Sequence, residues 1–211
     1  MAKGKQAIEI KRRIPHQARA GETVALILEA TAQILDAGGL PAFTTNAVAE
    51  RAGVSIGTLY QYFADKNAIL LALARQQMTV GLASVGRALR GESDPSVEGR
   101  VRAMVRAMVG GFGGRHRARK AVTQAILAQG LGIEMMDPIV AFVAAAGTRT
   151  GPGPRPLIAV LSSEQVFVLS RALMATIRHA VMEEKPFLRS RAFEDEVVRL
   201  IVAYLAAIRM Q

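Results

Sequence analysis

The sequence predicts an all-α protein. Ala, Leu, Val, Met and Arg are abundant, aromatic residues make up only 5% of the chain, and Trp is absent. Apolar residues recur at helical spacing in one segment after another, whereas the alternating apolar and polar runs typical of strands are scarce. Because 51% of the 211 residues are hydrophobic, the chain can bury a real core, as one large domain or as a small domain on a larger one.

Residues 1–20 are expected to form a flexible basic arm, with order beginning at Gly21 and Glu22 and Pro15 arguing against one continuous helix. Six Lys or Arg residues against one Glu within the first 19 positions give this arm +5 of the formal net charge of +10. A polyanion is the natural partner of such an arm. Nucleic acid is favoured, while an anionic membrane surface and a simple gain in solubility stay open.

The next 70 residues are predicted to form four helices. The first, of about four turns, carries apolar residues at helical spacing from Val24 to Leu35 and stops at Gly38-Gly39. The Thr44-Thr45 pair offers an N-cap to a short helix over 46–52, which Gly53 ends.

Ser55 offers a cap to a second short helix over 56–63, and Asp65 caps a long helix over 66–90. Leu59 and Phe63 lie one turn apart and are expected to point inwards, which turns residues 56–58 and 60–62 outwards or sideways. Two short helices joined by a tight turn that contains Gly form a helix-turn-helix.

The second half is predicted to contain longer helices at about 95–113, 116–130, 133–146, 161–184 and 190–209, with the Gly- and Pro-rich segment 147–156 as a surface loop. The last two helices carry broad apolar stripes. One stripe consists of Val166, Leu169, Leu173, Ile177 and Val181, and the other of Phe193, Val197, Leu200, Ile201, Tyr204, Leu205 and Ile208. Periodicity alone does not decide whether the stripes pack on a partner or on their own chain.

Residues 55–66 bring hydroxyls, an amide, two tyrosines and a lysine around the predicted turn. A helix-turn-helix reads DNA by laying its second helix in the major groove, where side chains reach base edges while hydroxyls and amines hold phosphates. Six outward positions within about two turns of a helix are hard to explain as plain surface. We therefore expect this segment to bind DNA.

The stretch "TTNAVAERAGVSIGTLYQYFADKNAIL" resembles the DNA-binding segment of the TetR family of bacterial transcriptional regulators. The family pattern of a Thr pair, Ile/Val-Ala, Ala-Gly-Val-Ser, Gly-Thr-Leu-Tyr, Tyr-Phe and Lys is present in register. The resemblance spans residues 22 to about 71. Beyond residue 75, only the length, the helical pattern and the paired C-terminal stripes agree.

The resemblance implies roles for individual residues. Phosphates would be contacted by Thr45, Thr58, Tyr60, Tyr62 and Lys66, and bases would be approached by Asn46, Ser55, Ile56, Gly57 and Gln61. The amides of Gln61 and Asn46 are able to pair with adenine, Gly57 permits close backbone approach, and the side chain of Ile56 suits a thymine methyl. This surface has no arginine, so the common guanine contact is missing.

Structural alternatives stay open for several of these residues. Asn46 equally suits solvation of its own helix start, Ile56 equally suits packing, and one of the two tyrosine rings is able to belong to the core. In the arm, Lys11, Arg12, Arg13 and Arg19 are candidates for contact with an adjacent minor groove.

The resemblance also implies a homodimer, with the last two helices of each chain forming a four-helix interface from the stripes named above. A two-fold dimer would bind a near-palindromic double-stranded operator. The middle helices would enclose a small-molecule effector, apolar or aromatic in character. Candidate pocket residues are Met104, Met108, Phe112, Gln124, Leu127, Met135, Met136, Phe142, Arg178 and His179, although Met and Phe at helical spacing are more often plain core.

Residues 100–120 contain seven Lys or Arg residues and no acid. A solvated helix face is the first interpretation of such a run, and attraction of an anionic effector or an extension of the DNA-facing charge are the others.

Nothing in the sequence points to catalysis, a metal or a cofactor. The three histidines are isolated, there is no Cys, and no phosphate-binding Gly loop occurs. The charged N-terminus lacks a following apolar segment and no uninterrupted apolar run is long enough for a membrane span, so a cytoplasmic protein that does not enter a membrane is expected.

The sequence therefore predicts a basic arm (1–20), a three-helix DNA-binding domain (21–67) and a larger helical domain for effector binding and dimerisation (68–211), with about nine helices in total. The function expected is a ligand-responsive transcriptional regulator, a repressor rather than an enzyme. A helical small-molecule enzyme with a fortuitous turn motif and an architectural DNA binder without an effector are the rival hypotheses.

Overall fold

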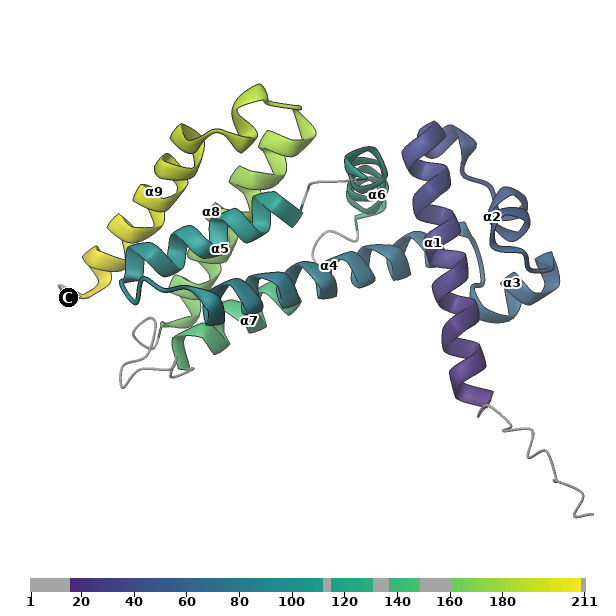
Figure 1. Cartoon of the computed structure of the whole chain (residues 1–211), viewed down its shortest axis with the longest axis horizontal. Coiled ribbons are helices and arrows are strands. Elements are labelled where there is room, and N and C mark those ends of the chain that lie inside the picture. Colours follow the sequence, from purple (N-terminus) through teal and green to yellow (C-terminus); the bar gives the residue numbers. More distant parts are fainter. Residues whose placement is uncertain (1–15, 112–114, 131–136, 149–160, 210–211) are drawn as a thin grey trace, which may run out of the picture.

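The computed structural model describes residues 16–111, 115–130, 137–148 and 161–209 (Figure 1). Within these ranges, the chain forms nine α-helices, one short 3₁₀ helix and no strand. The α-helices are α1 (His16–Ala42), α2 (Thr45–Ala52), α3 (Ile56–Tyr62), α4 (Lys66–Gly91), α5 (Val97–Gly111), α6 (His116–Ala128), α7 (Asp137–Thr148), α8 (Ser163–Met182) and α9 (Arg191–Arg209), and the 3₁₀ helix is η1 (Pro186–Arg189). The all-α prediction and the predicted number of helices are confirmed for this part of the chain.

Helix α1 begins at His16, five residues before the predicted start at Gly21. The prediction was wrong because Gly21 lies in the middle of a helical turn, where its backbone entropy cost is only about 1 kcal/mol and the neighbouring helix formers tolerate it. At the other end, Gly39 has φ of 64° and interrupts the helix at the predicted stop, after which the chain completes another turn to Ala42.

One further element and one further helix end differ from the predictions. The 3₁₀ helix between α8 and α9 was not predicted, and Gly147 and Thr148 belong to α7 instead of starting a loop. The rest of the predicted loop, through Pro156, and the predicted helical residues 133–136 lie outside the described residues.

One core joins the first three helices to the start of α4 and to α6. Ile27, Leu35, Leu59 and Ile69 are fully buried in it, and α6 contributes five apolar residues from Ala118 to Ile126. The predicted domain border at residues 67 and 68 therefore cuts through a continuous core, because α4 and α6 both complete the packing of α1.

A second core lies among α5, α7, α8 and α9, at the other end of α4 (Figure 1). Val105, Ile177 and Ile201 are buried at its centre, and Met78 and Leu82 of α4 pack against it. Helix α4 thus contributes side chains to both cores and connects them as one continuous helix.

Helices α1 and α4 are long and apolar enough to pass for membrane spans by length and composition alone. Helix α1 supplies buried residues to the first core, and α4 supplies buried residues to the first core and partly buried ones to the second.

Candidate DNA-binding site

The turn between α2 and α3 is built by local hydrogen bonds. The side chain of Thr44 caps α2 by accepting the Ala47 N–H at 3.1 Å, and that of Ser55 caps α3 by accepting the Thr58 N–H at 3.0 Å. Between the caps, Gly53 adopts φ of 68°, a left-handed conformation that glycine reaches without steric cost. The predicted helix-turn-helix and its capping residues are confirmed.

Helix α3 buries one side and exposes the other. Leu59 is 0% exposed and Phe63 is 7% exposed, as predicted. The side chains of Ile56, Tyr60 and Tyr62 are exposed, so neither tyrosine belongs to the core and Ile56 is not a packing residue. Gly57 and Gln61 are exposed as well, and Thr58 is half-buried. Most of the candidate contact residues thus lie on one solvent-facing side of the two helices.

Hydroxyl groups link the candidate residues to each other. Thr45 Oγ1 lies 3.2 Å from the Tyr60 hydroxyl and joins α2 to α3, and Ser55 Oγ lies 2.8 Å from Thr58 Oγ1. These contacts hold four candidate residues in fixed positions before any ligand binds, which lowers the entropy cost of binding. Sequence reasoning did not foresee the link between Thr45 and Tyr60, because the two residues lie 15 positions apart and no local pattern connects them.

Lys66 is the first residue of α4 and is exposed. The preceding Asp65 caps this helix, with the Ala68 N–H donating to Asp65 Oδ1 at 2.8 Å. The ammonium group of Lys66 therefore adds to the positive end of the helix dipole, an arrangement that attracts a phosphate.

The helix-turn-helix has no excess of positive charge of its own. Between residues 45 and 66, Arg51 and Lys66 are balanced by Glu50 and Asp65. Helix N-termini, hydroxyls and the basic arm must then supply the attraction for phosphates. Of the arm candidates, Arg19 is exposed near the start of α1, and Lys11, Arg12 and Arg13 lie outside the described residues.

The described members of the predicted effector set are distributed over α5, α6, α7 and α8. Met104 and Met108 pack against the second core, Phe142 is half-buried on α7, and Gln124 and Leu127 are exposed on α6. On α8, Arg178 is half-buried, and His179 is exposed with Nδ1 at 2.8 Å from the Ala175 carbonyl oxygen. Phe112, Met135 and Met136 lie outside the described residues.

A cavity lies elsewhere, between the end of α1 and α2. Its volume is about 630 Å³, and it is lined by Ile34, Ala37, Gly38, Ala42, Ala47, Glu50 and Arg51. None of the predicted effector residues lines it.

The predicted dimer stripes are mostly interior to the single chain. Val166, Leu169, Leu173, Ile177, Val197, Ile201 and Leu205 are buried in the second core, and Val181, Phe193 and Tyr204 pack against it. Ile208 is half-buried and Leu200 alone is exposed. Helices of the same chain cover most of each stripe, and the assignment of the stripes to a dimer interface stays a prediction.

Three large apolar residues of α8 and α9 are exposed, and two of them lie outside the predicted stripes. Phe167, Val168 and Leu200 are each about half exposed. Sequence reasoning missed the first two, although the run Val166-Phe167-Val168-Leu169 signals a helix that is apolar on more than one side.

Comparison with known proteins gives a match in the same segment. Residues 27–73 match the model of the bacterial regulatory proteins of the tetR family. The HTH-type transcriptional regulator BetI of Burkholderia ambifaria is 36% identical over 84 residues, which are 39% of this chain and 42% of BetI. The HTH-type transcriptional repressor KstR of Rhodococcus jostii is 51% identical over 51 residues, 24% of each chain. The chain thus spans less than half the length of the curated relatives it matches.

Solved structures extend the similarity of fold beyond this segment. The multidrug binding protein EbrR, complexed with imidazole, superposes with a TM-score of 0.61 at 18% identity, covering 94% of this chain and 97% of EbrR. The fold is therefore shared along nearly the whole chain. The capped turn and the outward-facing hydroxyls lie in the matched segment, so residues 27–73 are similar to the bacterial regulatory proteins of the tetR family.

Proposed function

We propose that the protein is a homodimeric transcriptional repressor that binds a near-palindromic operator and is released from it by a small-molecule effector. The observation that carries the proposal is the solvent-facing surface of α2 and α3, where Thr45, Tyr60 and Gln61 lie on a fixed helix-turn-helix. The relatives that share this segment are named transcriptional regulators, and one is named a repressor.

Phosphate contacts are assigned to Thr45, Thr58, Tyr60, Tyr62 and Lys66, and base contacts to Asn46, Ser55, Ile56, Gly57 and Gln61. In this proposal, the arm residues Lys11, Arg12, Arg13 and Arg19 reach the neighbouring minor groove. A protein that binds the chromosome in this way works in the cytoplasm, and no enzymatic activity is needed for the proposed role.

The dimer is proposed to form through the exposed sides of α8 and α9. Phe167, Val168 and Leu200 supply large apolar contacts. The Arg171 guanidinium lies over the ring of Phe167 in a cation–π contact, 4.2 Å from the ring centroid. Ala203 and Ala207 follow Leu200 along the exposed side of α9, and small residues allow two helices to approach closely. A pair of helices from each chain gives the isologous interface that two-fold symmetry requires.

The effector is proposed to act through α4. Because α4 has side chains in both cores, a ligand that binds among the middle helices and favours another position of α4 also moves the helix-turn-helix. The two reading helices of the dimer then no longer match the half-site spacing, and the differential affinity drives release. EbrR, which has the same fold, is described as binding multiple drugs.

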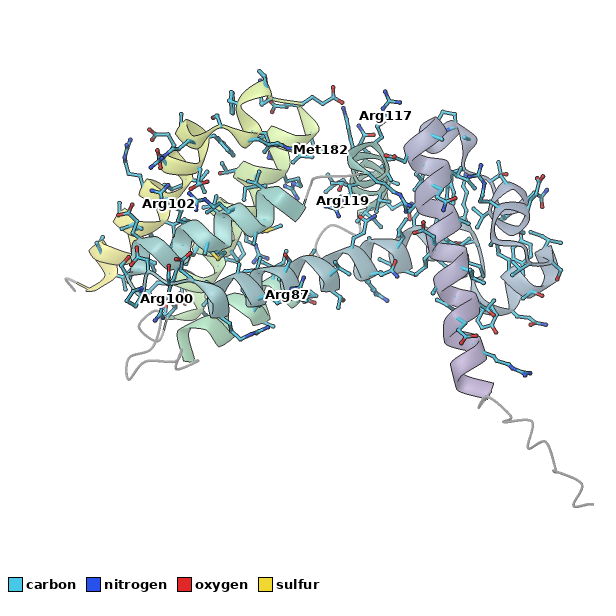
Figure 2. All side chains as sticks on the ribbon, viewed as in Figure 1. Arg87, Arg100, Arg102, Arg117, Arg119 and Met182 are labelled. Carbon is cyan, nitrogen blue, oxygen red and sulfur yellow. The ribbon has the colours of Figure 1, made fainter. Side chains whose placement is uncertain are left out.

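The experiment begins with selection of bound sequences from a random double-stranded DNA library. The double variant Tyr60→Ala plus Lys66→Ala is expected to bind the selected operator at least about tenfold more weakly, because it loses one hydrogen bond and one charge at each half-site. Arg87→Ala, which removes an exposed charge from the same helix far from the turn (Figure 2), is the matched control and is expected to bind normally. Equal operator binding by the double variant would show that this segment does not contact DNA.

A further inference from the structure

The basic run at residues 100–120 is largely explained by ion pairs with distant acids. Arg102 pairs with Glu98, Glu194 and Asp195, and Arg106 also pairs with Glu194. Arg115, the N-cap residue of α6, donates two hydrogen bonds to the Glu29 carboxylate of α1 at 2.6 and 2.8 Å, and Lys120 of α6 pairs with Glu184 at 2.5 Å. These cations connect helices and are not a purely solvated face.

Arg119 is different from its neighbours on α6. Its side chain is half-buried, and no hydrogen bond or ion pair to it is recorded among the described residues. Withdrawal from water lowers the pKa of its guanidinium below the ordinary value, and no partner opposes this shift. An unpaired charge that is partly removed from water costs free energy, and such a position is suited to a charge brought by a ligand.

The Arg119 side chain extends from α6 towards the C-terminal end of α5. Figure 2 shows Arg117 projecting away from the molecule, whereas Arg119 lies on the side of α6 that faces the end of α5. Its Nη1 atom would lie 3.9 Å from a Cβ atom on Gly111, the last residue of α5. Met108 and Met104, both half-buried, lie about one and two turns before Gly111 on the same helix.

We propose that Arg119 is an anion-binding residue that takes the carboxylate or phosphate group of an amphipathic small molecule, whose apolar part lies along Met108 and Met104. A guanidinium offers two parallel N–H donors that match either oxyanion. The proposal rests on the proposed effector-responsive function and names the chemical class of the effector.

Helix α6 is attached to the helix-turn-helix region at both ends. Near its start, Arg115 binds Glu29, which accepts a 2.9 Å hydrogen bond from Gln33, and Gln33 in turn accepts a 3.2 Å bond from Arg51 of α2. After its end, Gln129 donates to Asn67 Oδ1 at 3.2 Å, next to Lys66. An anion that draws Arg119 towards α5 therefore pulls on a helix with polar links to α2 and to the first turn of α4.

The test compares Arg119→Gln with Arg117→Gln, which removes an exposed charge from the same helix. The probes are decanoate and decyl phosphate, each below its critical micelle concentration, and 1-decanol as the uncharged control. The midpoint of thermal unfolding of the full chain is measured with each probe. We expect at least one anionic probe to raise the midpoint of the wild type and of Arg117→Gln, and Arg119→Gln to lose that increase. The two anions distinguish a carboxylate from a phosphate ligand.

Several results would overturn the proposal. They are an unchanged increase in Arg119→Gln, an equal increase with 1-decanol, and the absence of any increase with both anions in the wild type. If Arg119 only holds the C-terminal end of α5 in place, ligand-free Arg119→Gln has a lower unfolding midpoint but keeps its response to the anions. This result would also contradict the anion-binding proposal. Operator binding by the ligand-free wild type, measured in parallel, separates the two proposals. Absence of that binding would contradict the repressor while leaving an Arg119-dependent anion response intact.

Discussion

At the scale of single residues, side-chain caps set the starts of the helices that form the candidate site. Thr44, Ser55 and Asp65 each accept the backbone N–H of the residue three positions later, at 3.1, 3.0 and 2.8 Å. The backbone N–H groups of the first helical turn have no partner inside the helix. A capping side-chain oxygen accepts one of them in place of water, at the point where the chain changes direction. The turn is thereby fixed by residues that the sequence itself identifies.

Replacement of Asp65 tests this cap. Asp65→Ala is expected to lower the free energy of unfolding by about 1 kcal/mol, because the Ala68 N–H loses its acceptor. Asp65→Asn, which keeps a side-chain acceptor, is the control and is expected to retain most of that stability. Denaturant unfolding at one fixed protein concentration measures both values. Equal stability of Asp65→Ala and the wild type would show that the cap makes no net contribution.

At the scale of elements, α6 is attached to α1 by the ion pair between Arg115 and Glu29. The hydrogen bond from Arg115, followed by that from Gln33, lowers the pKa of Glu29 from 4.5 to about 2. A carboxyl group whose pKa is lower in the folded state contributes stability above its unfolded pKa, and this contribution is lost as the pH falls from about 4.5 towards 2. Since both side chains are about half exposed, we expect the contribution to stay below about 1 kcal/mol.

Glu29→Gln makes this pH dependence measurable. The difference in unfolding free energy between the wild type and Glu29→Gln is expected to favour the wild type near neutral pH and to shrink as the pH falls from 4.5 towards 2. Glu196→Gln, which alters an exposed pair within α9, is the matched control. A difference for Glu29→Gln that stays constant over this range would contradict the assigned ion pair.

The burial of some helix residues could be predicted from the sequence, whereas the packing partners of others and the long-range ion pairs could not. Leu59 and Phe63 were predicted to be buried because one short helix between two caps has a single possible inner side. Leu169, Leu173 and Ile201 were assigned to a partner chain, but they pack within their own. Periodicity identifies an apolar side of a helix, not the surface that covers it. The ion pairs of Arg102 and Arg115 with acids more than 80 positions away could not be predicted, because they depend on tertiary packing.

At the scale of the whole molecule, the two cores are connected by α4, and the candidate DNA-binding surface lies at one end of the chain's fold (Figure 1). The exposed apolar residues of α8 and α9 lie in the other part, which leaves the helix-turn-helix free in the proposed dimer. In the proposed function, this arrangement separates the dimer surface from the DNA-binding surface. It also makes α4 and α6 the elements through which an effector would act.

The central claim is that two copies of the chain contact operator phosphates through the residues around the turn. The most direct test is the salt dependence of operator affinity, measured for the wild type, Lys66→Ala and the control Arg87→Ala. Because each phosphate contact releases counterions, a dimer that loses one contact per chain is expected to show a slope of log K against log salt that is smaller by about 1.8. Arg87→Ala is expected to keep the wild-type slope. An unchanged slope for Lys66→Ala would contradict the account, and a decrease of about 0.9 would contradict the dimer.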